Sequence, residues 1–346
     1  MERDGAGRKA RLLAAIGDMR QVAGFQRLEL TEGKGKGNEV IHVRNGSGLT
    51  FQIAVSRAFD IGLCELHGLP LSWMSHCGPV TPHRYEPEGT EWNRSFEGGL
   101  LATCGLQTIG RPSVDRGIAY GQHGRISSEP AEVLQTEALW RGNEYELVFR
   151  GKMAESKATE EHVTLVRTIR TRLGDNTIEL HDVVTNETYR PVEHAIMYHF
   201  NFGWPLVSET TRIHIPSTAR RCLLGDDGDR WPRFGAPTES AEPVVVLHER
   251  LKAEEGTVSV VIENEVECFG GKRTLRAAID YPDGMLPCLT QWKHERAGIR
   301  ALGIEPGNVS TEGRAVHRSR GSMPQLAPWE SREYRFRLRL ELGEGR

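Results

Sequence analysis

Residues 334–342, Tyr-Arg-Phe-Arg-Leu-Arg-Leu-Glu-Leu, alternate strictly between apolar and charged side chains. Successive side chains of a β-strand point to opposite faces, so this period of two predicts a strand with one face on a core and the other in water. A similar alternation recurs, less strictly, at 49–56 and 144–149. The tetrapeptide at 45–48, Asn-Gly-Ser-Gly, precedes the first of these and is a strong hairpin signal.

More than ten such segments follow one another along the chain, and they are joined by turn-forming residues. The 346 residues include 38 glycines and 17 prolines, spread without a period, which favours many short strands over long helices. No alternation of strands with helices appears, which argues against a parallel doubly wound sheet. The sequence therefore predicts an all-β fold, a large antiparallel β-sandwich. Its irregular stretches, roughly 68–121 and 206–243, are rich in Gly, Pro, Trp and His and are the places where a site is expected.

Only the start of the chain has a helical period. Leu12, Leu13, Ile16 and Met19 form one apolar stripe of a short amphipathic helix between residues 9 and 22. A frayed terminal segment packed loosely on the domain is the alternative. We divide the chain into an N-terminal helical segment, 1–24, and a single β-sandwich domain, 25–346.

Charge and apolar composition exclude several classes of function. Lys and Arg number 44 against 47 Asp and Glu, a formal net charge of −3, so no excess of positive charge is present for a nucleic acid. No run of about 18 apolar residues exists for a membrane span, and the apolar stretch at 12–16 is too short for a secretory signal. The six cysteines are scattered without metal or redox spacing. We therefore expect reduced thiols in a cytoplasmic protein.

Three segments carry titratable residues at positions where a strand usually has apolar or small side chains. In the first, 121–126, His123 is flanked by Gly121 and Gly124, with Arg125 close behind. Glycine lets a ligand or another backbone segment approach closely. The alternative is a turn that carries an incidental surface histidine.

The second segment, 193–201, has a strand period. Its apolar face carries Ile196, Tyr198 and Phe200, so His199 and Asn201 point together to the opposite face. The alternative is a structural histidine whose hydrogen bonds are satisfied by the neighbouring asparagine.

The third segment, 297–308, puts Ala301, Gly303 and Glu305 on one strand face that small residues keep open. A carboxylate there has room for a ligand, although a glutamate that caps the following Pro306-Gly307 turn is the simpler alternative. A catalytic metal is disfavoured because the ligand spacings are poor, and no serine-hydrolase elbow or phosphate loop is present.

Five stretches, in this order, resemble the aldose 1-epimerase (galactose mutarotase-like) superfamily, and most closely a branch of unknown function. They read Ser-Arg-Ala-Phe-Asp-Ile-Gly at 56–62, Gly-Gly-Leu-Leu-Ala-Thr-Cys-Gly-Leu at 98–106, His-Gly-Arg at 123–125, Tyr-His-Phe-Asn-Phe-Gly at 198–203 and Gly-Ile-Glu-Pro-Gly-Asn at 303–308. The resemblance runs from about residue 56 to the C-terminus. It implies a large twisted β-sandwich, a galactose mutarotase-like supersandwich, with a sugar bound in a cleft on its concave face.

The resemblance also implies a catalytic trio and an activity, the interconversion of sugar anomers. Matching the motifs, His199 is the general acid toward the ring oxygen, Glu305 the general base toward the anomeric hydroxyl, and His123 an assisting histidine. Histidine and a buried glutamate suit this chemistry, because both can change protonation state near neutral pH. Neither a metal nor an organic cofactor is implied.

Further positions are expected to contact the sugar, and they are Arg57, Asp60, Arg125, Asn201 and Gln291. The 73–93 loop has no clear counterpart in well-characterised mutarotases, so the substrate could be an unusual, acidic or keto-sugar. Arg57, Arg111 and Arg125 would suit an acidic substituent. The partner expected is a small carbohydrate, with no nucleic acid and no membrane. An edge strand at 334–342 could pair in a homodimer, or its charges could prevent that.

Two other functions are compatible with the same residues. One is a non-catalytic carbohydrate-binding or sensor protein. The other is a glycoside-cleaving or lyase enzyme, which as a hydrolase would need a second carboxylate, Asp60 or Glu193, across the sugar from Glu305.

Overall fold

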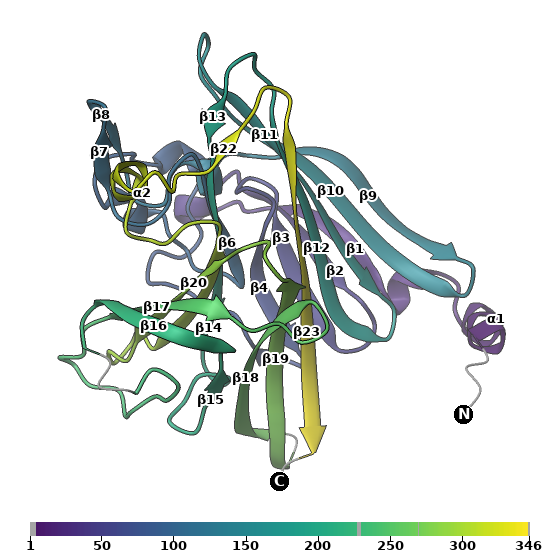
Figure 1. Ribbon diagram of the computed structural model, residues 1–346. Helices are drawn as coiled ribbons and strands as arrows, with labels where there is room; N and C mark the ends of the chain where they lie inside the picture. The colour runs from purple at the N-terminus through teal and green to yellow at the C-terminus, as the bar shows by residue number, and fades with distance from the viewer. Residues whose placement is uncertain (1–4, 227–229, 269, 345–346) are drawn as a thin grey trace.

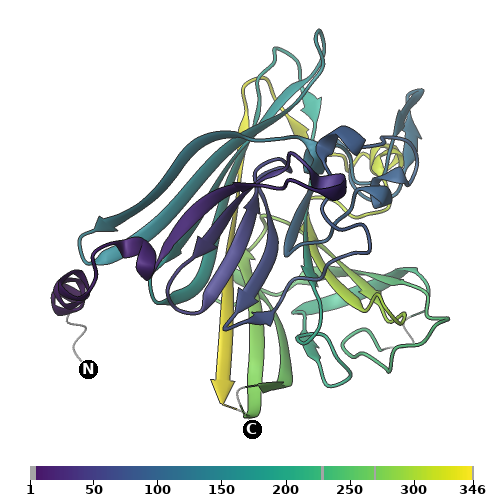
Figure 2. The same cartoon turned by 180° about the vertical axis from the view of Figure 1, so that it is seen from behind.

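Two large antiparallel sheets packed face to face form the body of the protein (Figures 1 and 2). The computed structural model describes residues 5–226, 230–268 and 270–344. One continuous apolar core, built from both sheets, lies between them. The prediction of a large antiparallel β-sandwich with a short N-terminal helix is confirmed.

The larger sheet has the strand order β1-β2-β3-β4-β6-β14-β21-β20-β17-β16, with β5 paired to β4. Its strands are β1 (Gly24–Glu29), β2 (Glu39–Arg44), β3 (Leu49–Ala54), β4 (Asp60–Leu66), β5 (Leu69–Pro70), β6 (Leu101–Leu106), β14 (Ala195–Phe202), β16 (Ser217–Leu224), β17 (Val244–Leu251), β20 (Cys288–His294) and β21 (Ala301–Gly307).

The smaller sheet has the order β15-β18-β19-β23-β12-β11-β10-β9. Its strands are β9 (Glu132–Arg141), β10 (Glu144–Ser156), β11 (His162–Arg172), β12 (Asp175–Asn186), β15 (Arg212–His214), β18 (Thr257–Cys268), β19 (Gly271–Pro282) and β23 (Ser331–Glu344). Two short pairs complete the strands: β7 (Ser113–Asp115) with β8 (Ile118–Tyr120), and β13 (Val192–Glu193) with β22 (Gln325–Leu326).

Helices are short and lie outside the sandwich. The α-helices are α1 (Gly5–Ala15) and α2 (Arg314–Ser319), and the 3-10 turns are η1 (Met19–Gln21), η2 (Gly33–Gly35), η3 (Pro82–Arg84), η4 (Glu91–Arg94) and η5 (Ile126–Ser128). The apolar stripe predicted one helix between residues 9 and 22, whereas α1 ends at Ala15 and η1 is a separate turn. The reason is local: Asp18 accepts a hydrogen bond from Arg20 N (2.8 Å), which caps a new turn. Residues 1–4 of the expected helical segment lie outside the described part.

The strand quoted first, now β23, alternates as predicted. Tyr334 and Phe336 are buried, while Arg335 and Arg337 are exposed. Its expected place at an edge is wrong, because β23 lies between β12 and β19 and pairs with both. Alternation reports which faces of a strand are buried, and it carries no information about whether the two edges are paired.

Strand β14 lies in the middle of the larger sheet, between β6 and β21, and every one of its residues is buried. Ile196, Tyr198 and Phe200 enter the core between the sheets. The other face packs under loops, where Met197 joins a second apolar cluster with Trp92.

Both views place the β7–β8 pair, α2 and the β16–β17 hairpin on one side of the molecule, away from α1 (Figures 1 and 2). Within the part of the chain that is described, no helix is long and apolar enough to cross a bilayer.

Candidate active site

His199 and Glu305 face each other across the β14–β21 pairing. The register Met197↔Gly307 and Asn201↔Gly303 puts Glu305 directly opposite His199. Their side chains meet, with His199 Nε2 3.1 Å from Glu305 Oε1. The contact is short, but it lacks the alignment of a hydrogen bond, since Glu305 Oε1 is buried without a hydrogen-bond partner among the described residues. Two strands of one sheet therefore hold an acid–base pair in place.

Burial controls the protonation of this pair. Loss of water raises the pKa of Glu305 to about 8, because burial penalises the carboxylate. It also lowers the pKa of His199 to about 4, because burial penalises the imidazolium, although the neighbouring Asn201 side chain opposes the drop. Near neutral pH the pair thus holds a single proton, which resides on Glu305 when the cleft is empty.

Gly303 leaves the space that this pair occupies. A Cβ atom at position 303 would stand 2.7 Å from Glu305 Oε1 and 3.0 Å from His199 Cε1. Both distances are shorter than side chains normally tolerate, so any larger residue must displace the pair. The small-residue face predicted for 301–305 is therefore the surface on which the two titratable side chains lie.

His123 reaches the same place from a loop. It lies between β8 and η5 in a left-handed backbone conformation, φ 58°, and its ring centroid is 5.9 Å from that of His199. The neighbouring glycines admit backbone rather than a ligand: a Cβ at Gly121 would lie 2.0 Å from Pro87 O, and one at Gly124 2.3 Å from Gly105 O. Burial, reinforced by His199, lowers the pKa of His123 to about 3, so this imidazole stays neutral.

The three groups open onto one cleft of about 870 Å³, which is large enough for a small-molecule ligand. Aromatic rings surround the acid–base pair: Phe96 and Trp292 contact the His199 ring at centroid distances of 5.4 and 5.9 Å. Trp73 packs against both of these rings, and its Nε1 donates to Ile299 O (2.6 Å). Flat apolar surfaces beside hydrogen-bonding groups suit a sugar, which has both kinds of face.

Charged groups are few in this cleft. Among the described residues that line it, Glu305 is the sole carboxylate and Arg111 the sole arginine or lysine. Arg111 is held by its backbone N, which donates to Thr311 O (3.0 Å), and by Nη2, which donates to Leu223 O (2.7 Å). The remaining guanidinium nitrogens have no partner within the described chain, so they can bind a ligand.

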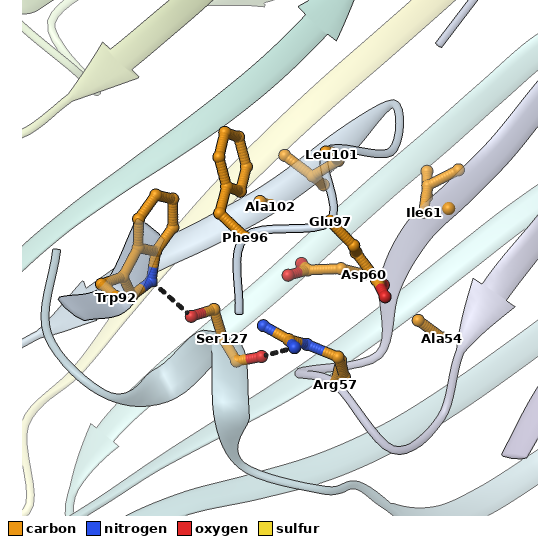
Figure 3. Close-up of a pocket in the computed structure, with 12 residues that line it drawn as sticks. Ala54, Arg57, Asp60, Ile61, Trp92, Phe96, Glu97, Leu101, Ala102 and Ser127 are labelled. Carbon is orange, nitrogen blue, oxygen red and sulfur yellow. Dashed lines mark hydrogen bonds between the residues drawn. The ribbon is translucent and has the colours of Figure 1, made fainter. Parts of the chain in front are cut away.

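Arg57 and Asp60, two of the positions expected to contact sugar, lie in a different, much smaller pocket of about 20 Å³ (Figure 3). Arg57 donates to Ser127 O (3.0 Å) and to Val80 O (3.1 Å). Asp60 accepts from Thr103 N (2.8 Å) and is paired with Arg167. Both side chains are engaged by protein groups away from the cleft.

The other three expected contacts also lie outside the cleft lining. Arg125 is exposed and stacks over the Tyr85 ring, 5.5 Å from its centroid. Asn201 is fully buried and donates to His199 O (2.9 Å). Gln291 lies between Thr290 and Trp292 on β20, and successive side chains of a strand point to opposite faces. Thr290 and Trp292 line the cleft, so the Gln291 side chain points away from it and donates a hydrogen bond to Trp231 O (2.7 Å).

Several residues of the site were not predicted individually from the sequence. Trp73, His76 and Phe96 come from the Trp- and His-rich stretch in which a site was expected. Trp292 and His294 alternate on β20, and only the pairing Trp292↔Gly303 brings them to the cleft. That pairing is a property of the assembled sheet, so local patterns could not identify these two residues.

The described side chains include no group of three or more His, Cys, Asp or Glu placed to hold a metal ion. The two partners that a hydrolase would need are occupied elsewhere: Glu193 pairs with Arg314 and Arg318, and Asp60 with Arg167.

Comparison with known proteins finds one family and several solved structures of similar fold. Residues 35–340 match a family described as a domain of unknown function, DUF4432. No curated protein sequence matches the chain.

Solved structures match over most of the chain. A Klebsiella pneumoniae protein with the provisional name aldose 1-epimerase superposes with a TM-score of 0.80 at 24% identity, over 91% of this chain and 83% of that one. A galactose mutarotase-like protein from Clostridium acetobutylicum gives 0.59 at 13% identity, over 94% and 100% of the two chains. A galactose 1-epimerase from Lactobacillus acidophilus gives 0.56 at 11% identity, over 93% and 100%. At these identities the likeness is one of fold.

Proposed function

This chain belongs to the DUF4432 family, a domain of unknown function, and we propose that it is a carbohydrate mutarotase that works by acid–base catalysis. The observation that carries the proposal is the buried contact of 3.1 Å between His199 Nε2 and Glu305 Oε1 in the lining of a cleft of about 870 Å³. The fold shared with aldose 1-epimerase-like and galactose mutarotase-like proteins supports it.

The proposed mechanism uses the single proton of the pair in two positions. A cyclic sugar binds with its anomeric hydroxyl toward Glu305 and its ring oxygen toward His199, and the pair is then in its ionic form, carboxylate and imidazolium. Glu305 takes the anomeric proton, the C1–O bond of the ring breaks as a carbonyl forms at C1, and His199 gives its proton to the ring oxygen.

This step leaves the pair neutral, with the proton on Glu305, which is the form that burial favours in the empty cleft. Rotation about the bond next to C1 presents the other carbonyl face. Reclosure reverses both transfers and gives the other anomer. His123, neutral and buried, donates a hydrogen bond that polarises the sugar.

We further propose that the substrate carries an acidic substituent. Of the three arginines expected to suit such a group, Arg111 is the one that lines the cleft. It follows Gly110, whose N–H contacts the His123 ring at 3.3 Å, and it lines the same cleft as His199 and Glu305, so the acidic group would bind in the cleft that holds the catalytic groups. The sole carboxylate of the described lining is protonated in the empty cleft, and in the ionic form of the pair the His199 imidazolium balances its charge, so it opposes the substituent little.

Glu305→Gln tests the proposal. Exchange between anomers is measured by NMR for a panel of neutral aldoses and uronates, and binding by calorimetry. We expect the exchange rate to fall on the order of 10² to 10⁴-fold while affinity changes little, because the amide keeps the shape and cannot take a proton. Glu155→Gln is the matched control, a buried carboxyl with a pKa raised by burial to about 7, away from the cleft.

Unchanged exchange in Glu305→Gln would disprove the mechanism. A wild-type protein that binds a sugar and accelerates no exchange would indicate the sensor instead, and His199→Ala would then reduce affinity alone. The hydrolase finds no support, because the described cleft lining holds no second carboxylate.

A further inference from the structure

Two buried polar atoms next to the catalytic pair lack a hydrogen-bond partner in the described structure, His199 Nδ1 and Asn201 Oδ1. One can donate a proton and the other can only accept one. The residues are two apart on β14, so their side chains leave the strand on the same face. Buried polar groups are nearly always paired, and each exception calls for an explanation.

The orientation of the Asn201 amide is decided by its other end. Nδ2 donates to His199 O (2.9 Å), and only the NH₂ group can make that bond. Oδ1 is therefore the free end, and it requires a donor. The Asn201 side chain also opposes the effect of burial on the pKa of His199, so it lies close to the His199 imidazole. The donor that best fits Asn201 Oδ1 is therefore a protonated Nδ1 of His199.

His123 is held the other way round. The backbone N–H of Gly110 donates to the ring nitrogen His123 Nδ1 (3.3 Å), and the backbone N–H of His123 donates to Gly110 O (3.1 Å). A ring nitrogen that accepts a hydrogen bond carries no proton, so the proton of this neutral imidazole is on Nε2. Trp92 packs on the ring at a centroid distance of 4.6 Å and is itself anchored by Nε1, which donates to Ser127 Oγ (2.9 Å).

We infer that Asn201 and Gly110 are positioning residues that hold the two histidines of the cleft in opposite tautomers. Asn201 receives the Nδ1 proton of His199, which leaves His199 Nε2 as an acceptor toward Glu305. Gly110 occupies His123 Nδ1, which leaves His123 Nε2–H as a donor.

The inference deepens the proposed function, on which its catalytic meaning rests. In the mutarotase mechanism, the proton on Glu305 can pass to His199 only if Nε2 is free to accept it, 3.1 Å away. The opposite tautomer would set two donors against each other. Asn201, expected from the sequence to contact sugar, thus acts through His199 instead.

The tautomers are measurable without any sugar. Long-range proton–nitrogen NMR on protein labelled with ¹⁵N-histidine distinguishes protonated from unprotonated ring nitrogens, and His199→Gln and His123→Gln assign the two signals among 13 histidines. We expect His199 to be protonated at Nδ1 and His123 at Nε2 in the wild-type protein. His199 protonated at Nε2 would overturn the inference for Asn201, and His123 protonated at Nδ1 would overturn it for Gly110.

Variants of Asn201 extend the test. Asn201→Leu removes the acceptor, and we expect His199 to lose its preference for Nδ1–H and exchange to slow about 10-fold. Asn201→Asp keeps an acceptor oxygen, so it should retain the tautomer and move the acid limb of the pH–rate profile to higher pH. Asn38→Leu is the matched control, because Asn38 is also buried, donates to a carbonyl (Val80 O, 3.1 Å) and has an unpartnered Oδ1, yet lies outside the cleft lining.

A wild-type tautomer in Asn201→Leu would overturn the role of Asn201. If that variant fails to fold, the wild-type spectrum and Asn201→Asp still decide the question. Failure of the proposed function looks different: the tautomers would be as expected, while no sugar in the panel exchanges faster than it does without protein.

Discussion

Two neighbouring residues on β14, Tyr198 and His199, belong to two buried polar clusters with opposite properties. Tyr198, on the core face, donates to Asp182 Oδ2 (2.8 Å) in a cluster built around Arg167, a fully buried arginine. Arg167 donates to Asp182 through Nε (2.9 Å) and Nη2 (2.6 Å), and it also pairs with Asp60. On the cleft face, His199 and Glu305 touch each other and leave buried atoms without hydrogen bonds.

The difference separates a structural cluster from a reactive one. In the Arg167 cluster each charge has an opposite charge and well-made hydrogen bonds, so the protein completes it without help. In the cleft the burial is as deep, but Glu305 Oε1 is left without a hydrogen-bond partner among the described residues. A buried and incompletely bonded acid–base pair marks a place where a ligand supplies the missing partner.

The largest expected effect is on the free energy of unfolding, and it comes from disrupting the Arg167 cluster. Arg167→Met should lower the free energy of unfolding by about 3–5 kcal/mol, because it leaves the carboxylates of Asp60 and Asp182 buried without their cation. Urea denaturation measures the loss. The control is Arg339→Met, whose pair with Asp280 is about one third exposed on the arginine side and should contribute about 1 kcal/mol or less.

Glu305→Gln belongs in the same experiment. It should change the free energy of unfolding by about 1 kcal/mol or less, because Glu305 has no ion pair with a cationic partner near neutral pH to lose. A loss as large as that of Arg167→Met would place Glu305 among the structural groups and remove the contrast.

The next effect sharpens the reactive side. Gly303→Ala adds a Cβ 2.7 Å from Glu305 Oε1 and should slow anomer exchange about 10- to 100-fold, since small displacements of catalytic groups are costly. Exchange NMR measures the change. Gly343→Ala is the control in another strand, because its Cβ meets nothing closer than Thr274 O at 3.9 Å. Equal rates in the two variants would show that the pair moves aside without consequence.

The same contrast explains which features could be predicted from sequence. Alternation such as that in 334–342 predicted the fold class. The order of the motifs identified His123, His199 and Glu305, the three residues that meet at the cleft. Asp60 and Asn201 were expected to contact sugar because both are polar and lie within those motifs. Their hydrogen bonds lead instead to Arg167 and to His199 O, and such pairings depend on strands distant in sequence or on the direction of one amide.

The smallest effect is graded and concerns pH. The reactive form of the pair holds one proton, so kcat/KM should be level between about pH 4 and 8, the pKa values of His199 and Glu305 in the free protein. Below pH 4 a second proton binds, and the pair can no longer accept the anomeric proton. Above pH 8 the last proton leaves, and none remains for the ring oxygen. Each limb should fall tenfold per pH unit, and Arg167, whose pKa is raised far beyond this range, should add no limb of its own. Exchange rates measured across pH 3.5 to 9.5 check the profile. A single limb centred near the ordinary pKa of histidine would mean that His199 acts as a solvated group, and the distinction between the two faces of β14 would then fail.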